Sequence, residues 1–176
     1  MRPRRQAALL PRDGNRVSLF HDGGACLAVM LEAIRAASRE ILLEMYWFGS
    51  DVTGRRFAEA LIERARRGVR VCVTYDAVGS WETDAAQFDR MREAGCDVHV
   101  YNPPKRWRFR FKVGNRRDHR KLLVIDGHVG MTGGVNLADP WAPVEQGGQG
   151  FRDNLICIEG PAVADMRTIF GATWPH

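Results

Sequence analysis

Three polar side chains that together could handle a phosphate lie in the second half of the sequence. His119 carries an imidazole, Lys121 an ammonium group, and Asn136 an amide that follows Gly133 and Gly134 closely. An imidazole can attack phosphorus or transfer a proton, while a fixed cation and an amide can hold phosphate oxygens. Gly134 leaves its position free of a side chain. These residue types predict a phosphate site, provided that the fold brings them together.

A predicted β-hairpin would do so. Apolar runs flank an Asp-Gly pair at residues 126–127, and such a pair is the strongest short signal for a tight hairpin. With a two-residue loop, Lys121 faces Thr132. His119 then faces Gly134, so that the two basic side chains project from one side of the sheet.

An interpretation without any catalytic role also fits the same residues. A lone His or Lys at a strand end is usually solvated surface, and Asp126 favours turns because it can bond its own backbone. Gly133 and Gly134 also fit a β-bulge. Spacing and register alone leave both interpretations open.

The rest of the chain alternates short apolar runs with segments of helical spacing. This alternation predicts an α/β fold with a mixed, largely parallel sheet flanked by helices. The expected strands are residues 16–20, 40–48, 69–75, 96–101, 121–125, 128–132 and 151–159, and the expected helices are residues 26–38, 53–67, 84–94 and 162–170.

The chain of 176 residues suits one compact domain, which we expect at residues 16–176 after a disordered basic tail at residues 1–15. Its 4 cysteines form no C-x-x-C pair, so that a zinc site is not indicated and buried thiols in a reducing compartment are expected. No apolar stretch approaches the roughly 18 residues of a membrane span.

The formal net charge of +5 is concentrated in one strip. Residues 105–121 hold nine basic residues and one acidic residue, whereas the chain outside this strip and the N-terminal tail is acidic. Aromatic residues alternate with the cations, so that an extended strip would separate them onto two faces. The candidate membrane- or anion-binding residues are Lys105, Arg106, Trp107, Arg108, Phe109, Arg110, Arg116 and Arg117.

Composition leaves the partner of this strip open. At an anionic membrane, aromatic side chains would enter the interface and cations would meet headgroups. On a single-stranded nucleic acid, cations would follow phosphates and aromatic rings would stack on bases. An exposed basic loop with no specific partner fits as well.

The motif His119-x-Lys121-x4-Asp126-x6-Gly133-Gly134-x-Asn136 resembles the signature of the phospholipase D superfamily. The flanking sequence, over roughly residues 15–174, is similar to that of bacterial cardiolipin synthases and related phosphatidyltransferases. Gly134 stands where many superfamily members have Ser. The segments that carry this similarity are residues 43–48, 54–57, 75–80, 117–127 and 152–163.

The resemblance implies phosphodiester chemistry without a metal or other cofactor, through a covalent phosphohistidine. His119 would be the nucleophile or the general acid, and Lys121 and Asn136, beside Gly133 and Gly134, would hold the phosphate oxygens. The motif's Asp126 would be structural, as the turn argument also indicates.

Asp153 matches the acid that in this family supports the histidine ring through its second nitrogen. Such a carboxylate fixes the tautomer and stabilises the imidazolium. His119, Lys121, Asp126, Asn136 and Asp153 therefore form the candidate catalytic set.

The resemblance favours phosphatidyl transfer on anionic phospholipids, at the cytoplasmic periphery of the inner membrane. A homodimeric nuclease or phosphodiesterase, and an inactive half that only binds anionic lipid or a partner, remain alternatives. The family site needs two such motifs and this chain has one, so a second copy or a missing C-terminal half would complete it. We expect an isolated monomer to be inactive.

Overall fold

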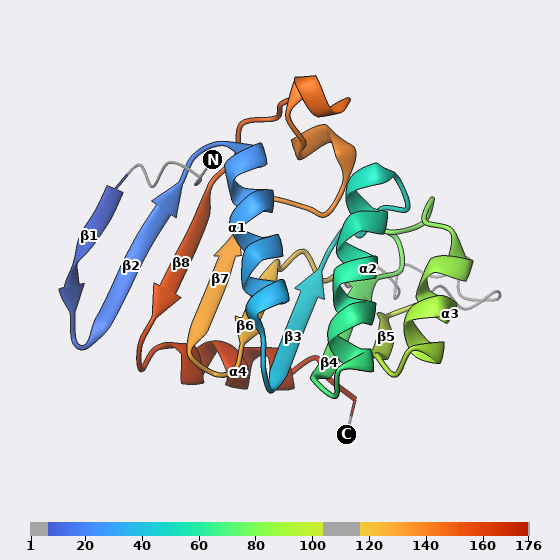
Figure 1. Cartoon of the computed structure of the whole chain (residues 1–176). Helices are drawn as coiled ribbons and strands as arrows, with labels where there is room; N and C mark the ends of the chain where they lie inside the picture. Colours follow the sequence, from blue (N-terminus) through green and yellow to red (C-terminus); the bar gives the residue numbers. More distant parts are fainter. Residues whose placement is uncertain (1–6, 104–116, 176) are drawn as a thin grey trace.

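The computed structural model describes residues 7–103 and 117–175, and these form one sheet with helices on both faces (Figure 1). The 8 strands follow the order β1-β2-β8-β7-β6-β3-β4-β5. The strands are β1 Ala7–Arg12, β2 Asn15–Phe20, β3 Glu40–Met45, β4 Arg70–Asp76, β5 Asp97–Tyr101, β6 Leu122–Ile125, β7 Val129–Gly133 and β8 Leu155–Glu159. The helices are α1 Gly23–Ala36, α2 Val52–Arg66, α3 Ala85–Glu93 and α4 Val163–Gly171, with short 3-10 turns at Asp139–Trp141 and Val144–Gln146.

The expected mixed α/β class is confirmed, but the parallel part of the sheet is smaller than predicted. Within the described residues only β3 with β4 and β4 with β5 pair in parallel, through the crossover helices α2 and α3. The other neighbouring strands pair antiparallel. The reason is that, from residue 117 on, β6 and β7 form a hairpin and a loop with 3-10 turns leads to β8, so that no crossover helix makes these strands parallel.

Two apolar cores fill the space between the sheet and its helices. The larger core joins α1, α2 and α3 to one face, with Leu43, Leu123 and Met131 at its centre. The smaller core joins α4 to the other face, where it contacts Leu42 and Leu122. Side chains alternate between these two faces along each strand.

An aspartate begins each of the three helices on the larger core. Asp22, Asp51 and Asp84 accept a hydrogen bond from a backbone amide of the first turn at 2.9, 2.9 and 3.0 Å. Each carboxylate satisfies a donor that the helix itself leaves unpaired, and its negative charge suits the helix N-terminus.

The β6–β7 hairpin forms, but its register differs by one residue from the prediction. Asp126 and Gly127 occupy the turn with φ of 54° and 69°, as the Asp-Gly signal indicates. His128 then adds an extra residue, so that Thr132 lies opposite Leu122 rather than Lys121. A residue in a bulge beside the turn shifts the pairing in this way.

The expectation of a disordered N-terminal tail was wrong for the described part of that segment. Residues Ala7–Arg12 form β1, which pairs antiparallel with β2 through a turn at Asp13 and Gly14 with φ of 52° and 78°. This is the same Asp-Gly turn signal as at residues 126–127. Residues 1–6 lie outside the described part of the chain.

Whereas Asp126 lies at one end of the sheet, strand direction brings His119, Lys121, Asn136 and Asp153 to the other end. Parallel β3, β4 and β5 end there, β7 ends there, and antiparallel β6 and β8 begin there. Segments far apart in the sequence therefore meet at this end of the sheet.

Candidate active site

His119 and Lys121 lie together just before β6. Lys121 Nζ donates a hydrogen bond to the backbone oxygen of His119 at 2.8 Å and lies 3.2 Å from its Nδ1. His119 is exposed, whereas only 5% of the Lys121 surface is exposed. The structure thus holds a buried ammonium group against a solvent-accessible imidazole.

Burial lowers the pKa of Lys121, and the carboxylates of Asp153 and Asp118 oppose this by favouring the charged form. A cation that has already lost much of its water has little solvation left to lose when a phosphate arrives. Its attraction to the anion is also less screened than at the surface.

Tyr46, which the sequence did not single out as a site residue, covers both basic side chains. Its ring centroid lies 4.3 Å from that of His119 at a tilt of 42°, and 5.1 Å from Lys121 Nζ. Ser80 Oγ donates to the backbone oxygen of Tyr46 at 3.3 Å. A Cβ on Gly79 would lie 2.1 Å from that oxygen, so glycine is what lets the loop after β4 approach.

Asn136 lies buried in the segment after β7, with its amide orientation fixed. Its Oδ1 accepts a hydrogen bond from the backbone amide of Trp47 at 3.1 Å. Because the side-chain oxygen is occupied, the NH2 group is the part available to donate to a ligand. Thr132 Oγ1 donates to the Lys121 oxygen at 2.9 Å and so ties β7 to the same segment.

Asp153 is held just before β8 by two donors. Trp141 Nε1 donates to its Oδ2 at 3.0 Å, and the backbone amide of Asn154 donates to its Oδ1 at 2.8 Å. A Cβ on Gly134 would lie 2.2 Å from Asp153 Oδ1, so the carboxylate fills the space that a side chain at position 134 would need. In the described part of the chain Asp153 makes no hydrogen bond to His119, and its expected support of the ring stays a prediction.

Asp126 lies at the opposite end of β6 from His119. Its carboxylate accepts hydrogen bonds from the Ser38 hydroxyl and from the backbone amides of Ser38, Arg39 and Glu40, at 2.7–2.9 Å. Burial alone would raise its pKa, but these donors lower the pKa of Asp126 to about 2. Asp126 occupies the turn as expected, but its carboxylate bonds residues 38–40 of another segment rather than its own backbone. A structural rather than a chemical role stays a prediction.

The segment that leads into His119 is anchored by Asp76 at the end of β4. This carboxylate is 1% exposed and accepts from the backbone amides of Val78, Gly79 and Asp118 at 2.8–3.0 Å. Arg117 Nη1 lies 3.6 Å from it. The sequence offered only one signal for this role, a charged residue at the end of an apolar strand.

Most of the proposed membrane- or anion-binding strip cannot be compared with the structure. Residues Lys105, Arg106, Trp107, Arg108, Phe109, Arg110 and Arg116 lie outside the described residues. Arg117 lies within the described residues, and its guanidinium also donates to the backbone oxygen of Asn102 at 3.2 Å. Its part in anion binding stays a prediction.

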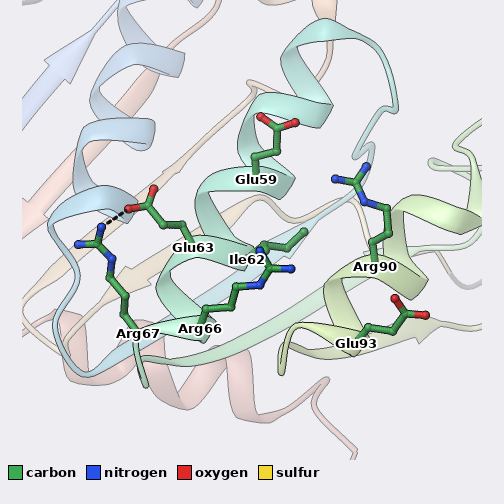
Figure 2. Close-up of a pocket in the computed structure, with 7 residues that line it drawn as sticks. All are labelled: Glu59, Ile62, Glu63, Arg66, Arg67, Arg90 and Glu93. Carbon is green, nitrogen blue, oxygen red and sulfur yellow. Dashed lines mark ion pairs between the residues drawn. The ribbon is translucent and has the colours of Figure 1, made fainter.

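A separate groove lies between α2 and α3 (Figure 2), and neither His119 nor Lys121 is among its lining residues. Its charged lining residues are Glu59, Glu63, Arg66, Arg67, Arg90 and Glu93. Figure 2 shows the Glu63–Arg67 ion pair, at 2.8 Å. The lining holds as many acidic as basic residues, so it has no net positive charge to attract an anion. We therefore do not regard this groove as the phosphate site.

Within residues 7–103 and 117–175 no group of three or more His, Cys, Asp and Glu side chains is placed to hold a metal ion. The four cysteines are free thiols and all are buried, as expected. No helix in these residues is both long and apolar enough to span a bilayer.

The fold is that of phospholipase D-like domains. Nuc, a phospholipase D family member from Salmonella typhimurium, superposes with a TM-score of 0.68 at 18% identity, over 91% of this chain and 94% of that one. Phosphatidylserine synthase from Haemophilus influenzae Rd KW20 gives a TM-score of 0.65 at 15% identity, over 87% of this chain and 35% of that one.

Sequence comparison then defines the family. The model of the family "Cardiolipin synthase, PLD-like domain" matches residues 30–174, and the chain belongs to this family. It is 33% identical over 160 residues to cardiolipin synthase A of Pseudomonas fluorescens, and 36% identical over 160 residues to cardiolipin synthase of Oceanobacillus iheyensis. Each match covers 91% of this chain and 33% of the relative, so the chain spans about a third of the length of these curated relatives.

Proposed function

We propose that this chain is one catalytic half of an enzyme that transfers phosphatidyl groups between anionic phospholipids, through a phosphohistidine at His119. The observation that carries the proposal is the buried Lys121 ammonium at 3.2 Å from the accessible His119 ring. This pair supplies a nucleophile and a fixed positive charge where a phosphodiester can reach both. The cardiolipin synthase relatives support a lipid substrate.

In the proposed reaction a His119 ring nitrogen attacks phosphorus, and the bond from phosphorus to the leaving alcohol breaks. Lys121 Nζ and the Asn136 NH2 group stabilise the charge on the non-bridging oxygens. An acceptor alcohol then gives its proton to the group that had protonated the leaving alcohol and attacks phosphorus, and the bond from phosphorus to His119 breaks and restores the imidazole. Asp153 would favour the charged ring during this cycle.

One histidine cannot both carry the phosphatidyl group and protonate the leaving alcohol in the same step. We therefore infer that a second motif supplies the general acid. The length of the cardiolipin synthase relatives favours a further half of a longer chain. The near-complete overlap with Nuc favours the alternative, pairing of two copies across a twofold axis.

The proposed place of action is the cytoplasmic surface of the inner membrane, where anionic phospholipid is available. A homodimeric phosphodiesterase acting on nucleic acid is the second candidate, because the fold overlaps a complete, short phospholipase D family chain. An inactive half that binds anionic lipid or a partner is the third.

One experiment separates these functions. The purified chain, alone and mixed with a candidate partner half, is incubated with phosphatidylglycerol vesicles and separately with single-stranded DNA. Cardiolipin and free glycerol from the vesicles support phosphatidyl transfer, whereas DNA cleavage supports the second candidate. Binding to vesicles without turnover supports the third.

A matched His119→Ala preparation is the control. If the variant retains full activity on either substrate, the proposed chemistry is wrong. Gel filtration of each preparation gives the assembly that is active, and full turnover by a single-chain monomer would contradict the need for a second motif.

A further inference from the structure

A pair of buried carboxyl groups lies behind the candidate active site, on the α4 face of the sheet. Glu44 of β3 is 1% exposed, and Asp118, which directly precedes His119, is 7% exposed. Leu42, two residues before Glu44 on β3, and Leu122, the first residue of β6, pack in the core under α4. Neither carboxyl group belongs to the chemistry proposed above, and both are costly to bury as anions.

Only one oxygen of each carboxyl group has a hydrogen-bond donor. Glu44 Oε1 accepts from Arg120 Nη2 at 2.9 Å and from Thr173 Oγ1 at 2.7 Å. Asp118 Oδ1 accepts from the backbone amide and Nε of Arg120 at 3.1 and 3.0 Å. Among the described residues, the remaining oxygens, Glu44 Oε2 and Asp118 Oδ2, are buried and find no donor.

Arg120 bridges the two carboxyl groups, because its Nε donates to Asp118 and its Nη2 to Glu44, and this places them side by side. Two ionised carboxylates cannot bond to each other, because both only accept. One proton between them turns Glu44 into a donor, satisfies both remaining oxygens and removes one of two buried negative charges. Arg120 then balances the charge that is left.

Among the described residues, Arg120 is the one cation that forms an ion pair with either carboxylate. Asp76 of β4 accepts from the Asp118 backbone amide, and Arg117 is engaged with Asp76. The charged and titratable groups around the pair are Arg117, Arg120 and Lys121 before β6, Asp76 of β4, Tyr101 of β5, and His99 of β5 beyond Trp174.

We propose that Glu44 is protonated and donates a hydrogen bond to the carboxylate of Asp118, and that this shared proton positions the segment carrying His119 and Lys121. Asp118 is then fixed twice, by its backbone on Asp76 and by its side chain on Glu44. Glu44 and Asp118 are positioning residues, since among the described residues neither side chain forms a hydrogen bond to His119 or Lys121. Only their effect on turnover rests on the proposed function.

The expected ionisation follows the same geometry. Burial, and next the hydrogen bond with Asp118, raise the pKa of Glu44 to about 8. Burial alone would also raise the pKa of Asp118, but hydrogen bonds from Glu44 and Arg120 hold it below its usual range. One acid of the pair thus stays neutral at pH 7 while the other stays charged.

The direct test is a carboxyl ¹³C NMR titration of the whole chain with labelled glutamate. We expect one resonance to titrate near pH 8, where an ordinary glutamate titrates at about 4.3. The resonance should be missing in Glu44→Gln. It should move to lower pH in Asp118→Asn, whose amide can donate to an ionised Glu44, but stay above the ordinary range because Glu44 remains buried.

If every glutamate titrates below about pH 5.5, far from the range expected for Glu44, the shared proton does not exist. The wild-type titration decides this even where a variant fails to fold, and it needs no activity. A neutral Glu44 in an inactive protein would therefore support the shared proton and count against the proposed function alone.

Turnover of the active assembly tests the positioning role. We expect kcat to fall as pH rises through about 8, because a second buried charge then separates Asp118 from Glu44, while KM changes little. Glu44→Gln can still donate to Asp118 and should lack this alkaline limb, whereas Glu44→Ala should have low kcat at every pH. An identical alkaline limb in wild type and Glu44→Gln would overturn the positioning role.

Discussion

Replacing Asp126 by Asn tests whether this motif residue is structural. Its carboxylate holds the hydroxyl and amide of Ser38 and the amides of Arg39 and Glu40. The lowering of its pKa from 3.8 to about 2 corresponds to about 2.5 kcal/mol of preference for the charged form. Because the group is partly exposed, solvent screening reduces this to about 1–2 kcal/mol.

At pH 7 we therefore expect Asp126→Asn to lower the free energy of unfolding by about 1–2 kcal/mol, and Tm by about 2–8 °C for a chain of this size. The lowered pKa also fixes the sign of the pH dependence. The contribution of Asp126 is complete above about pH 4 and is lost as pH falls through about 2, so the two stability curves should converge in acid.

Urea denaturation between pH 2 and 7 measures both effects, with Asp97→Asn as the control because Asp97 is an exposed aspartate of β5. The active assembly should keep its turnover at 25 °C in Asp126→Asn. Wild-type stability across this range combined with lost turnover would refute the reasoning and place Asp126 in the chemistry.

Three further substitutions address the site itself. Lys121→Met should lower kcat by about 10²–10³-fold in the vesicle assay, because it removes the cation beside the proposed phosphate; a loss under tenfold would contradict that role. Gly134→Ala should destabilise the fold by about 1–3 kcal/mol in urea, since its Cβ would lie 2.2 Å from Asp153 Oδ1. Gly171→Ala, which meets nothing within 4 Å, should not be destabilising. Trp141→Phe should cost about 1–3 kcal/mol in the same assay, because it removes the donor to the charged Asp153; wild-type stability would show that this bond contributes nothing.

Local sequence signals predicted the order of helices and strands from β2 onwards, because helical spacing and Asp-Gly turns act over a few residues. They also contained the signal for β1, which a concentration of arginines obscured. Such local signals could not predict the pairing register of β6 and β7. Whether His128 pairs or bulges depends on neighbouring chain segments, such as the backbone of Glu40, whose oxygen accepts from the Asp126 amide at 2.8 Å.

The site was predictable to the extent that its residues are close in sequence. The motif indicated that His119 and Lys121 act together, and the contact at 3.2 Å agrees. The position of Tyr46 in the site could not be predicted from the motif, because Tyr46 follows another strand and is distant in sequence from His119. Glu44 stood out as a charge within an apolar strand, but a pairing with Asp118 requires the β3–β6 register.

The segment at residues 118–121, which leads into β6, explains why neighbouring residues have such different roles. Alternation sends His119 and Lys121 to one face and Asp118 and Arg120 to the other. The first pair meets the proposed substrate, and the second ties the segment to Glu44 by hydrogen bonds. Because one backbone carries both pairs, a change on the α4 face moves the imidazole even though no side chain there touches the substrate.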